Sequence, residues 1–475
     1  MVDKGMYING NWIKLEEKIE VLNPATKEVF ATVPKGGEIE AREAVDAAYE
    51  AFQTWSKRTA HERSSYLKKW YQLINENREE IAEIMTKEQG KPLKEALGEV
   101  LYANSFIEWY AEEGKRIYGE TIPASHPNKR ILVLKQPVGV IAAITPWNFP
   151  AAMITRKVAP ALAAGCTAVI KPASQTPLTA IKLVELAHEA GIPKGVINLV
   201  TGSARAIGNA WLQDSRVRKI SFTGSTEVGK ELMRGAADTV KKVSLELGGH
   251  APFIVMDDAD IKQAVEAVIA SKFRNAGQTC ICTNRVYVQE SIYESFIEKM
   301  KEAVQKLKVG NGLQEEVHIG PLIDEQALEK VKEHLKDAEE KGGKVMYGAR
   351  AVEEESGYFI EPAIISYAND DMLCMNEETF GPVAPVTTFK TMEEAINRAN
   401  NTPYGLAAYV FTKDLTKALQ ISEQLEYGIV GLNDGLPSVA QAPFGGFKES
   451  GIGREGGHYG IEEYLEIKYV SIGLV

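Results

Sequence analysis

Apolar residues recur at helical spacing along the first quarter of the chain. From residue 38 to residue 55, the apolar positions near the helical period are Ile39, Val45, Ala48 and Phe52. The stretch 61–85 shows the same period through Leu67, Trp70, Leu73, Ile74, Ile81 and Ile84. The pattern predicts helices over 38–55 and 61–85, within a region that is helical from 38 to 115.

Short continuous apolar runs replace the helical pattern after residue 137, as is typical of strands buried on both faces of a sheet. The runs occupy residues 138–144, 167–171, 196–200, 217–222 and 242–246. Helical stretches separate them at 151–164, 177–189, 204–213 and 227–236. This alternation predicts an open parallel sheet of the nucleotide-binding type, with right-handed crossovers.

A second alternation begins after Gly248 and Gly249 and continues to about residue 433. Its first strands are predicted at 252–256 and 285–289, and its first helices around 260–274 and 291–307. The fold class is therefore α/β, with a domain boundary near residue 248. Residues 461–474 alternate like an edge strand, which is a natural partner for the sheet of another subunit.

Composition narrows the class of protein. The chain has 475 residues, enough for two or three domains of about 150 residues each. A formal net charge of −11 argues against a surface for nucleic acid or acidic membranes. No apolar run is long enough to span a bilayer, and the first residues lack the apolar core of a signal peptide.

Four cysteines do not make a disulfide framework, so we expect a cytoplasmic protein with reduced thiols. The seven histidines form no H-x-x-x-H pair, and no metal site is expected.

Two glycine-rich segments partly match nucleotide-binding motifs. Residues 224–230 read GSTEVGK, but Glu231 stands where a P-loop needs Ser or Thr to hold magnesium, so an NTPase is disfavoured. The glycines still suit close approach of a phosphate to the start of a helix. Residues 451–456 spell G-x-G-x-x-G without a surrounding βαβ unit, and we interpret them as a glycine-rich loop.

Three side chains carry candidate chemistry. Cys280 follows a glycine-containing loop, where a thiol can be exposed and its pKa lowered, although a cysteine taken alone is more often a buried small residue. Glu246 ends the last predicted parallel strand, at the edge where ligands collect. Asn148 stands between two prolines and could donate to an oxyanion or cap a helix.

The motifs together resemble the aldehyde dehydrogenase superfamily, and most closely its succinate-semialdehyde dehydrogenases. The resemblance runs from YINGNW and NPATKEV near the N-terminus to PFGGFKESGIGREGG near the C-terminus. Between them stand TPWNFP, KPASQTP, FTGSTEVG, LELGG, GQTC and EETFGPV, in family order. The resemblance implies an NAD(P)-dependent oxidation of succinate semialdehyde to succinate. It makes Cys280 the nucleophile, Glu246 the general base and Asn148 an oxyanion donor.

The resemblance also implies the architecture. A Rossmann-like cofactor domain would comprise residues 1–117 and 138–248, and an α/β catalytic domain residues 249–445. Residues 118–137 and 455–475 would form a small oligomerisation β-arm, so a homo-oligomer is expected.

Cofactor preference is expected to depend on the loop after the second predicted strand. Relatives that prefer NAD often carry Glu three residues after the lysine equivalent to Lys171, and this chain has Ser174 there. A small neutral residue leaves room for a 2′-phosphate, which favours NADP while tolerating NAD; alternatively, Ser174 is only a loop residue. The other cofactor contacts that the resemblance implies are Thr145, Pro146, Trp147, Gly224, Ser225, Glu378 and Phe380.

Substrate preference is expected to depend on two arginines. Arg156, Arg274 and Ser438 resemble carboxylate-binding positions, and two guanidiniums in one pocket would hold a carboxylate strongly. Each arginine could instead form an ordinary surface ion pair.

Cys282 is a candidate redox partner of Cys280, with simple packing as the alternative. Glutarate semialdehyde, lactaldehyde or betaine aldehyde remain alternative substrates, and a non-catalytic homologue remains an alternative class.

Overall fold

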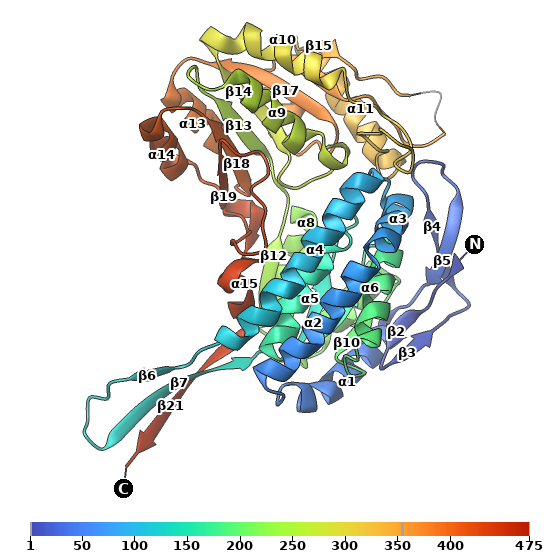
Figure 1. Ribbon diagram of the computed structural model, residues 1–475, viewed down its shortest axis with the longest axis vertical. Coiled ribbons are helices and arrows are strands. Elements are labelled where there is room, and N and C mark those ends of the chain that lie inside the picture. Colours follow the sequence, from blue (N-terminus) through green and yellow to red (C-terminus); the bar gives the residue numbers. More distant parts are fainter. Residues whose placement is uncertain (1, 353–355, 475) are drawn as a thin grey trace.

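The computed structural model describes residues 2–352 and 356–474. Two large sheets, each covered by helices, form the body, and a narrow three-stranded arm projects from it (Figure 1). The α/β class predicted from the alternating pattern is confirmed.

The first sheet has eight strands in the order β20-β12-β11-β8-β9-β10-β2-β3. Its five central strands are parallel, as predicted, and are β8 (Val140–Ile144), β9 (Thr167–Lys171), β10 (Ile197–Leu199), β11 (Val217–Thr223) and β12 (Lys242–Glu246). The connecting helices are α5 (Ala152–Ala164), α6 (Pro177–Glu189), α7 (Ala204–Gln213) and α8 (Thr226–Ala237). The carboxyl ends of these strands therefore open at one edge, where ligands bind in such sheets.

Antiparallel strands extend both sides of this sheet. The hairpin of β2 (Met6–Ile8) and β3 (Asn11–Ile13) pairs with β10, and β20 (Gly451–Ile452) pairs with β12. The segment 451–456 is thus more than the loop that the sequence suggested. A Cβ at Gly451 would lie 2.1 Å from the Leu245 carbonyl oxygen, and the backbone there has φ +148°, so only glycine allows this pairing beside Glu246.

Helices cover both faces of the first sheet. One face packs against α5 and α6, with α2 (Ala60–Glu76), α3 (Arg78–Gln89) and α4 (Leu93–Glu113) outside them; the other face packs against α1 (Glu38–Trp55), α7 and α8. The helix predicted over 38–55 is confirmed, whereas the single helix predicted over 61–85 is wrong. The break falls at Asn77, whose backbone has ψ 15° and whose side-chain amide donates to the Leu73 carbonyl at 2.8 Å. Side-chain bonding of this kind ends a helix that periodicity alone would continue.

The second sheet has seven strands in the order β15-β16-β17-β14-β13-β18-β19. They are β13 (Ala251–Val255), β14 (Thr283–Gln289), β15 (Lys344–Tyr347), β16 (Ala363–Ser366), β17 (Val383–Phe389), β18 (Ala407–Phe411) and β19 (Ile429–Leu432), with β15 antiparallel to β16. Its helices are α9 (Ile261–Lys272), α10 (Tyr293–Val304), α11 (Glu325–Glu340), α12 (Leu373–Asn376), α13 (Met392–Asn400) and α14 (Leu415–Gln424). The two strands and two helices predicted at its start are confirmed within a few residues.

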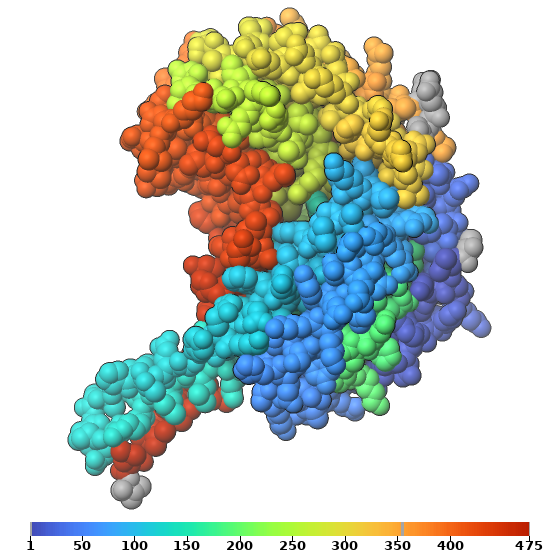
Figure 2. Space-filling model, viewed as in Figure 1, coloured from blue at the N-terminus to red at the C-terminus, as the bar shows by residue number. Residues whose placement is uncertain are grey.

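The arm consists of β6 (Glu120–Ile122), β7 (Lys129–Pro137) and β21 (Leu465–Gly473), and it stands clear of the body (Figure 2). The predicted tail strand begins later than residue 461, because α15 (Gly457–Glu462) occupies its first residues. β21 pairs along its whole length with β7 of its own chain. A second small sheet, separate from the arm, contains β1 (Val2–Asp3), β4 (Lys18–Leu22) and β5 (Val29–Pro34).

None of the helices in residues 2–352 and 356–474 is both long and apolar enough to cross a membrane. Within the same residues, no group of three or more His, Cys, Asp or Glu side chains is arranged to hold a metal ion.

Candidate active site

Two pockets meet at Cys280. We call the first the arginine pocket, which is about 240 Å³ and is lined by Cys280, Arg156, Arg274, Ser438, Phe149 and Phe444 among others. We call the second the strand-end pocket, which is about 250 Å³ and is lined by Cys280, Asn148, Gly224, Ser225, Glu378 and Phe380 among others. In the described part of the chain, no other residue lines both. A thiol in this place can react with one ligand while facing another.

The turn that presents Cys280 has an unusual backbone. In the preceding segment Arg274–Gly277, Asn275 and Ala276 have φ of 52° and 54°, in the left-handed region. Gly277 also has positive φ, and a Cβ there would lie 2.2 Å from the Gly381 carbonyl oxygen. Left-handed residues other than glycine cost free energy and are often found at functional sites.

The thiol of Cys280 is not activated in the way the sequence suggested. Burial raises the pKa of Cys280 to about 12, and the nearby Arg156 charge only partly opposes this effect. The expectation of a lowered pKa is therefore wrong for the cofactor-free protein. An apolar surrounding disfavours the thiolate more than a nearby cation, already shared with a carboxylate, can favour it.

Asn148 lies in the segment between β8 and α5 and is almost completely buried. Its side-chain nitrogen donates to the Gln278 carbonyl at 3.1 Å. An amide nitrogen has two N–H donors, so one remains for a ligand in the strand-end pocket. This geometry suits an oxyanion donor better than a helix cap, because no cap hydrogen bond is formed at the start of α5.

Glu246 ends β12, opposite Gly451 of β20. Its side chain is 3% exposed, and its Oε2 atom has no hydrogen-bond partner among the described residues. Burial and the neighbouring Glu455 raise the pKa of Glu246 well above its ordinary value. Glu246 lines neither pocket, so a role as general base requires a side-chain movement or an intervening water.

Arg156 is buried in α5, so it does not form the surface ion pair that was the alternative. Its guanidinium lies 2.7 Å from a carboxylate oxygen of Glu455 and 4.0 Å from the centre of the Phe444 ring. Glu455 also pairs with the buried Lys157. One carboxylate therefore faces two cations, and part of the positive charge remains for a ligand.

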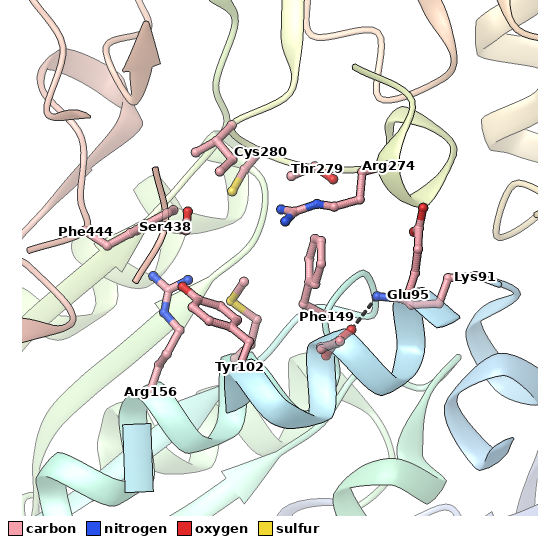
Figure 3. A pocket seen from close by; sticks show the side chains of 14 residues that line it. Lys91, Glu95, Tyr102, Phe149, Arg156, Arg274, Thr279, Cys280, Ser438 and Phe444 are labelled. Atoms are coloured by element: carbon pink, nitrogen blue, oxygen red, sulfur yellow. Dashed lines mark hydrogen bonds and ion pairs between the residues drawn. The ribbon is translucent and has the colours of Figure 1, made fainter. Parts of the chain in front are cut away.

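Arg274 and Ser438 complete the predicted substrate group, and both lie with Arg156 around the same space (Figure 3). The Arg274 guanidinium stacks over Phe149, 5.1 Å from the ring centre, and forms no ion pair within residues 2–352 and 356–474. The Ser438 hydroxyl is buried and likewise lacks a partner in that part of the chain. Both groups are available to an anionic ligand, which would be held by charge-assisted hydrogen bonds.

The strand-end pocket has the features that a dinucleotide needs. Ser225 caps the N-terminus of α8, where backbone N–H groups favour a phosphate. Glu378 accepts a hydrogen bond from the Gly249 N–H at 3.1 Å, and burial raises the pKa of Glu378 to about 7. Its second oxygen lies 3.0 Å from the position of a Cβ on Gly248, so that glycine keeps the carboxylate accessible. These residues fit a pyrophosphate and a ribose hydroxyl.

Only some of the predicted cofactor residues line the strand-end pocket. Pro146, Trp147, Gly224, Ser225, Glu378 and Phe380 line the strand-end pocket. Thr145, Lys171 and Ser174 do not, although the Thr145 N–H donates to the Lys171 carbonyl and keeps the two strand ends together. Burial lowers the pKa of Lys171 to about 8. Ser174 is half-buried and lines a separate cavity beside Glu88.

Several residues of the site carry little or no signal in the sequence. Lys330 of α11 lines the strand-end pocket and donates to the Glu378 carbonyl at 2.6 Å, but nothing distinguishes it from other lysines of an amphipathic helix. Glu455 stands in the glycine-rich segment 451–456, and that segment was the only signal for it. Lys91 and Glu99 also line the arginine pocket without a local signal.

Cys282 is buried and lines neither pocket. Its sulfur donates to the Lys272 carbonyl at 3.3 Å. This position favours a packing role, because the thiol would have to leave that carbonyl to meet Cys280. Redox pairing of the two cysteines stays a prediction.

The chain belongs to the aldehyde dehydrogenase family, whose model matches residues 12–470. It is 57% identical to an NADP⁺-dependent succinate-semialdehyde dehydrogenase of Escherichia coli K12, over 98% of this chain and 97% of that protein. It is also 57% identical to a glutarate-semialdehyde dehydrogenase of Pseudomonas putida, with the same coverage. A solved succinate-semialdehyde dehydrogenase of Burkholderia pseudomallei has a TM-score of 0.98 at 52% identity, covering 99% of this chain and 98% of that one.

The raised pKa of Cys280 can be tested by alkylation of the cofactor-free protein. Because the thiol is protonated at neutral pH, its labelling rate by iodoacetamide should rise about tenfold per pH unit between about pH 7 and pH 9. Mass spectrometry of the Cys280 peptide measures the rate, with Cys280→Ser as the background. A rate that is already constant above about pH 7 would mean that the thiolate is stabilised in the free protein.

Proposed function

We propose that this protein oxidises succinate semialdehyde to succinate, with NADP⁺ as the preferred cofactor and NAD⁺ as a tolerated one. The observation that carries the proposal is the position of Cys280 between a pocket that fits a dinucleotide and a pocket with two arginines. The E. coli and B. pseudomallei relatives support the same substrate, and the E. coli relative supports NADP⁺.

The first half of the reaction forms a covalent adduct on Cys280. The thiol passes its proton to solvent water in the pocket and its sulfur attacks the aldehyde carbon, which produces a thiohemiacetal oxyanion. The free N–H of the Asn148 amide and the backbone N–H of Cys280 stabilise this charge. The chemistry that NAD(P)⁺ supplies when bound is hydride acceptance, which leaves a thioester on Cys280.

The second half is hydrolysis. Burial and the neighbouring Glu455 raise the pKa of Glu246, so its carboxylate is a stronger base than an exposed one and can take a proton from water. The resulting hydroxide attacks the thioester carbon and releases the carboxylic acid and the Cys280 thiolate.

The substrate carboxylate binds between Arg274 and Arg156. Arg274 contributes the larger attraction, because Arg156 already shares its charge with Glu455. Ser438 offers its hydroxyl as a further donor. This charge disfavours lactaldehyde, which has no carboxylate, and betaine aldehyde, which is a cation.

Glutarate semialdehyde is the second candidate substrate. The Pseudomonas putida relative supports it at the same identity as the E. coli relative supports succinate semialdehyde. One methylene changes binding by only about 1–3 kcal/mol, so the same arginines accept both chain lengths to some degree.

We also propose a homo-oligomer that works in the cytoplasm. Exposed apolar residues on β21, among them Ile467 and Tyr469, give the arm an edge suited to another subunit. The cysteines are unpaired, which fits a reducing compartment. Residues 1–117 and 138–248 would be the cofactor domain, 249–445 the catalytic domain, and 118–137 with 455–475 the oligomerisation segment.

Cys280→Ala should abolish dehydrogenase activity and leave folding and cofactor binding intact, because among residues 2–352 and 356–474 no other side chain lines both pockets. Initial rates, a thermal melt and cofactor titration by fluorescence measure the three properties. Cys374→Ala, which removes a buried thiol in α12, is the matched control. Hydride transfer by Cys280→Ala well above background would place the nucleophile elsewhere, and a non-catalytic homologue would show no activity in either variant.

Ser174→Glu should shift preference from NADP⁺ toward NAD⁺. The new carboxylate accepts bonds from ribose hydroxyls and repels the 2′-phosphate. The ratio of kcat/KM for the two cofactors is the measurement, and Ser174→Gln separates the effect of charge from that of size. If Ser174→Glu leaves the ratio unchanged, Ser174 does not face the 2′ position.

Arg274→Ala and Arg156→Ala should each lower kcat/KM for succinate semialdehyde at least about tenfold, because a charge-assisted bond is worth roughly 1.5–3 kcal/mol. The loss should be larger for Arg274, whose charge is not shared. An uncharged aldehyde of similar length is the control substrate. Equal losses for charged and uncharged aldehydes would show that the arginines are structural.

A further inference from the structure

Lys91 lines the arginine pocket, yet its ammonium group is held mainly by other groups of the protein. The side chain is 1% exposed. Its nitrogen pairs with a carboxylate oxygen of Glu99, donates to the Asn148 carbonyl at 2.8 Å and lies 4.0 Å from the centre of the Phe149 ring. A lysine ammonium has three N–H donors; two of them go to protein oxygens, and the charge also lies over the Phe149 ring.

Glu99 connects Lys91 to the start of α5. Its other oxygen accepts from the N–H groups of Ala151 and Ala152, at 2.9 and 3.3 Å. A carboxylate is favourable at a helix N-terminus, where these N–H groups lack partners within the helix. The pair Lys91 and Glu99 therefore fixes both ends of the short segment from Asn148 to α5.

The remaining bonds of Asn148 lead to the nucleophile loop. The Asn148 carbonyl accepts a second bond, from the Asn275 side chain at 3.0 Å, and the Asn148 side chain donates to the Gln278 carbonyl. The only charged donor on this residue is Lys91, among the residues that the structure describes. A charged hydrogen bond in a buried place is the strongest of these restraints.

We propose that Lys91, held by Glu99, is a positioning residue that fixes the main chain of Asn148 so that its amide meets the oxyanion. The inference rests on the proposed oxyanion role of Asn148. It separates two uses of positive charge in one pocket: Arg156 and Arg274 bind the substrate carboxylate, and Lys91 binds only the protein. Displacement of a catalytic group by about 1 Å can cost about a hundredfold in rate, so loss of Lys91 affects kcat.

The experiment measures kcat and KM for five variants with succinate semialdehyde and with an uncharged aldehyde of similar length. Lys91→Met removes the ammonium at nearly constant volume. Lys91→Met/Glu99→Gln also neutralises the buried carboxylate and keeps an oxygen for the start of α5, in case the single variant does not fold. Asn148→Ala, alone and combined with Lys91→Met, provides the reference. Lys94→Met, which removes an exposed lysine from the first turn of α4, is the matched control. A thermal melt checks that each variant is folded.

The proposal expects kcat to fall about 10- to 100-fold in Lys91→Met or the double variant, equally for both aldehydes, with KM changed less than about threefold. Adding Lys91→Met to Asn148→Ala should lower kcat no further, because Lys91 acts through Asn148. Lys94→Met should behave as the unmodified protein.

Other outcomes overturn the proposal. A rise in KM for succinate semialdehyde alone would make Lys91 a third ligand of the substrate carboxylate. Additive losses in the Lys91→Met/Asn148→Ala variant, or an unchanged kcat in a folded Lys91 variant, would leave Lys91 with a structural role only. If Asn148→Ala keeps full kcat, the proposed oxyanion role of Asn148 is wrong, and the inference about Lys91 is wrong with it. The Asn148→Ala measurement by itself distinguishes this case from the others.

Discussion

The short link from the end of β12 to the start of β13 is the constraint on which the site depends. Four residues, Leu247, Gly248, Gly249 and His250, connect the first sheet to the second. A Cβ on Gly249 would lie 2.2 Å from the Cys280 carbonyl oxygen, so the link and the nucleophile loop can approach this closely only without a side chain. The link thus holds the carboxyl ends of the first sheet against the turn that carries Cys280, where the two pockets meet.

Buried charges hold the walls of these pockets in place. Glu455 faces Arg156 and Lys157, and Glu99 faces Lys91, all with almost no exposure to solvent. Removing one partner from such a group leaves a buried charge unpaired, which is strongly destabilising, although the complete pair adds little net stability. These ion pairs fix the positions of the side chains that line the pockets. Glu455 binds two cations, and Glu99 binds one cation and the start of a helix.

The same burial explains the proton chemistry of the site. It raises the pKa of Cys280, Glu246 and Glu378 together, so the cofactor-free protein holds a protonated thiol beside carboxyl groups that titrate above their ordinary range. A resting thiol that is protonated is less exposed to adventitious oxidation and alkylation. Activation then requires a change in the surroundings of the thiol, such as the arrival of ligands in the two pockets.

By itself the sequence determined what depends on short-range pattern. The five central strands and four helices of the first sheet, the helix over 38–55 and the position of Cys280, Glu246 and Asn148 at element ends followed from periodicity and motif spacing, because burial of a strand or helix face imposes a local repeat. Tertiary structure decided the rest. Asn77 broke a periodic helix through one side-chain bond, β20 joined the sheet from more than 200 residues away along the chain, and Lys91, Glu455 and Lys330 entered the site from elements with no local signal. The pKa of Cys280 was also beyond the sequence, since it depends on how many groups from distant segments exclude water from the thiol, and no local pattern records that number.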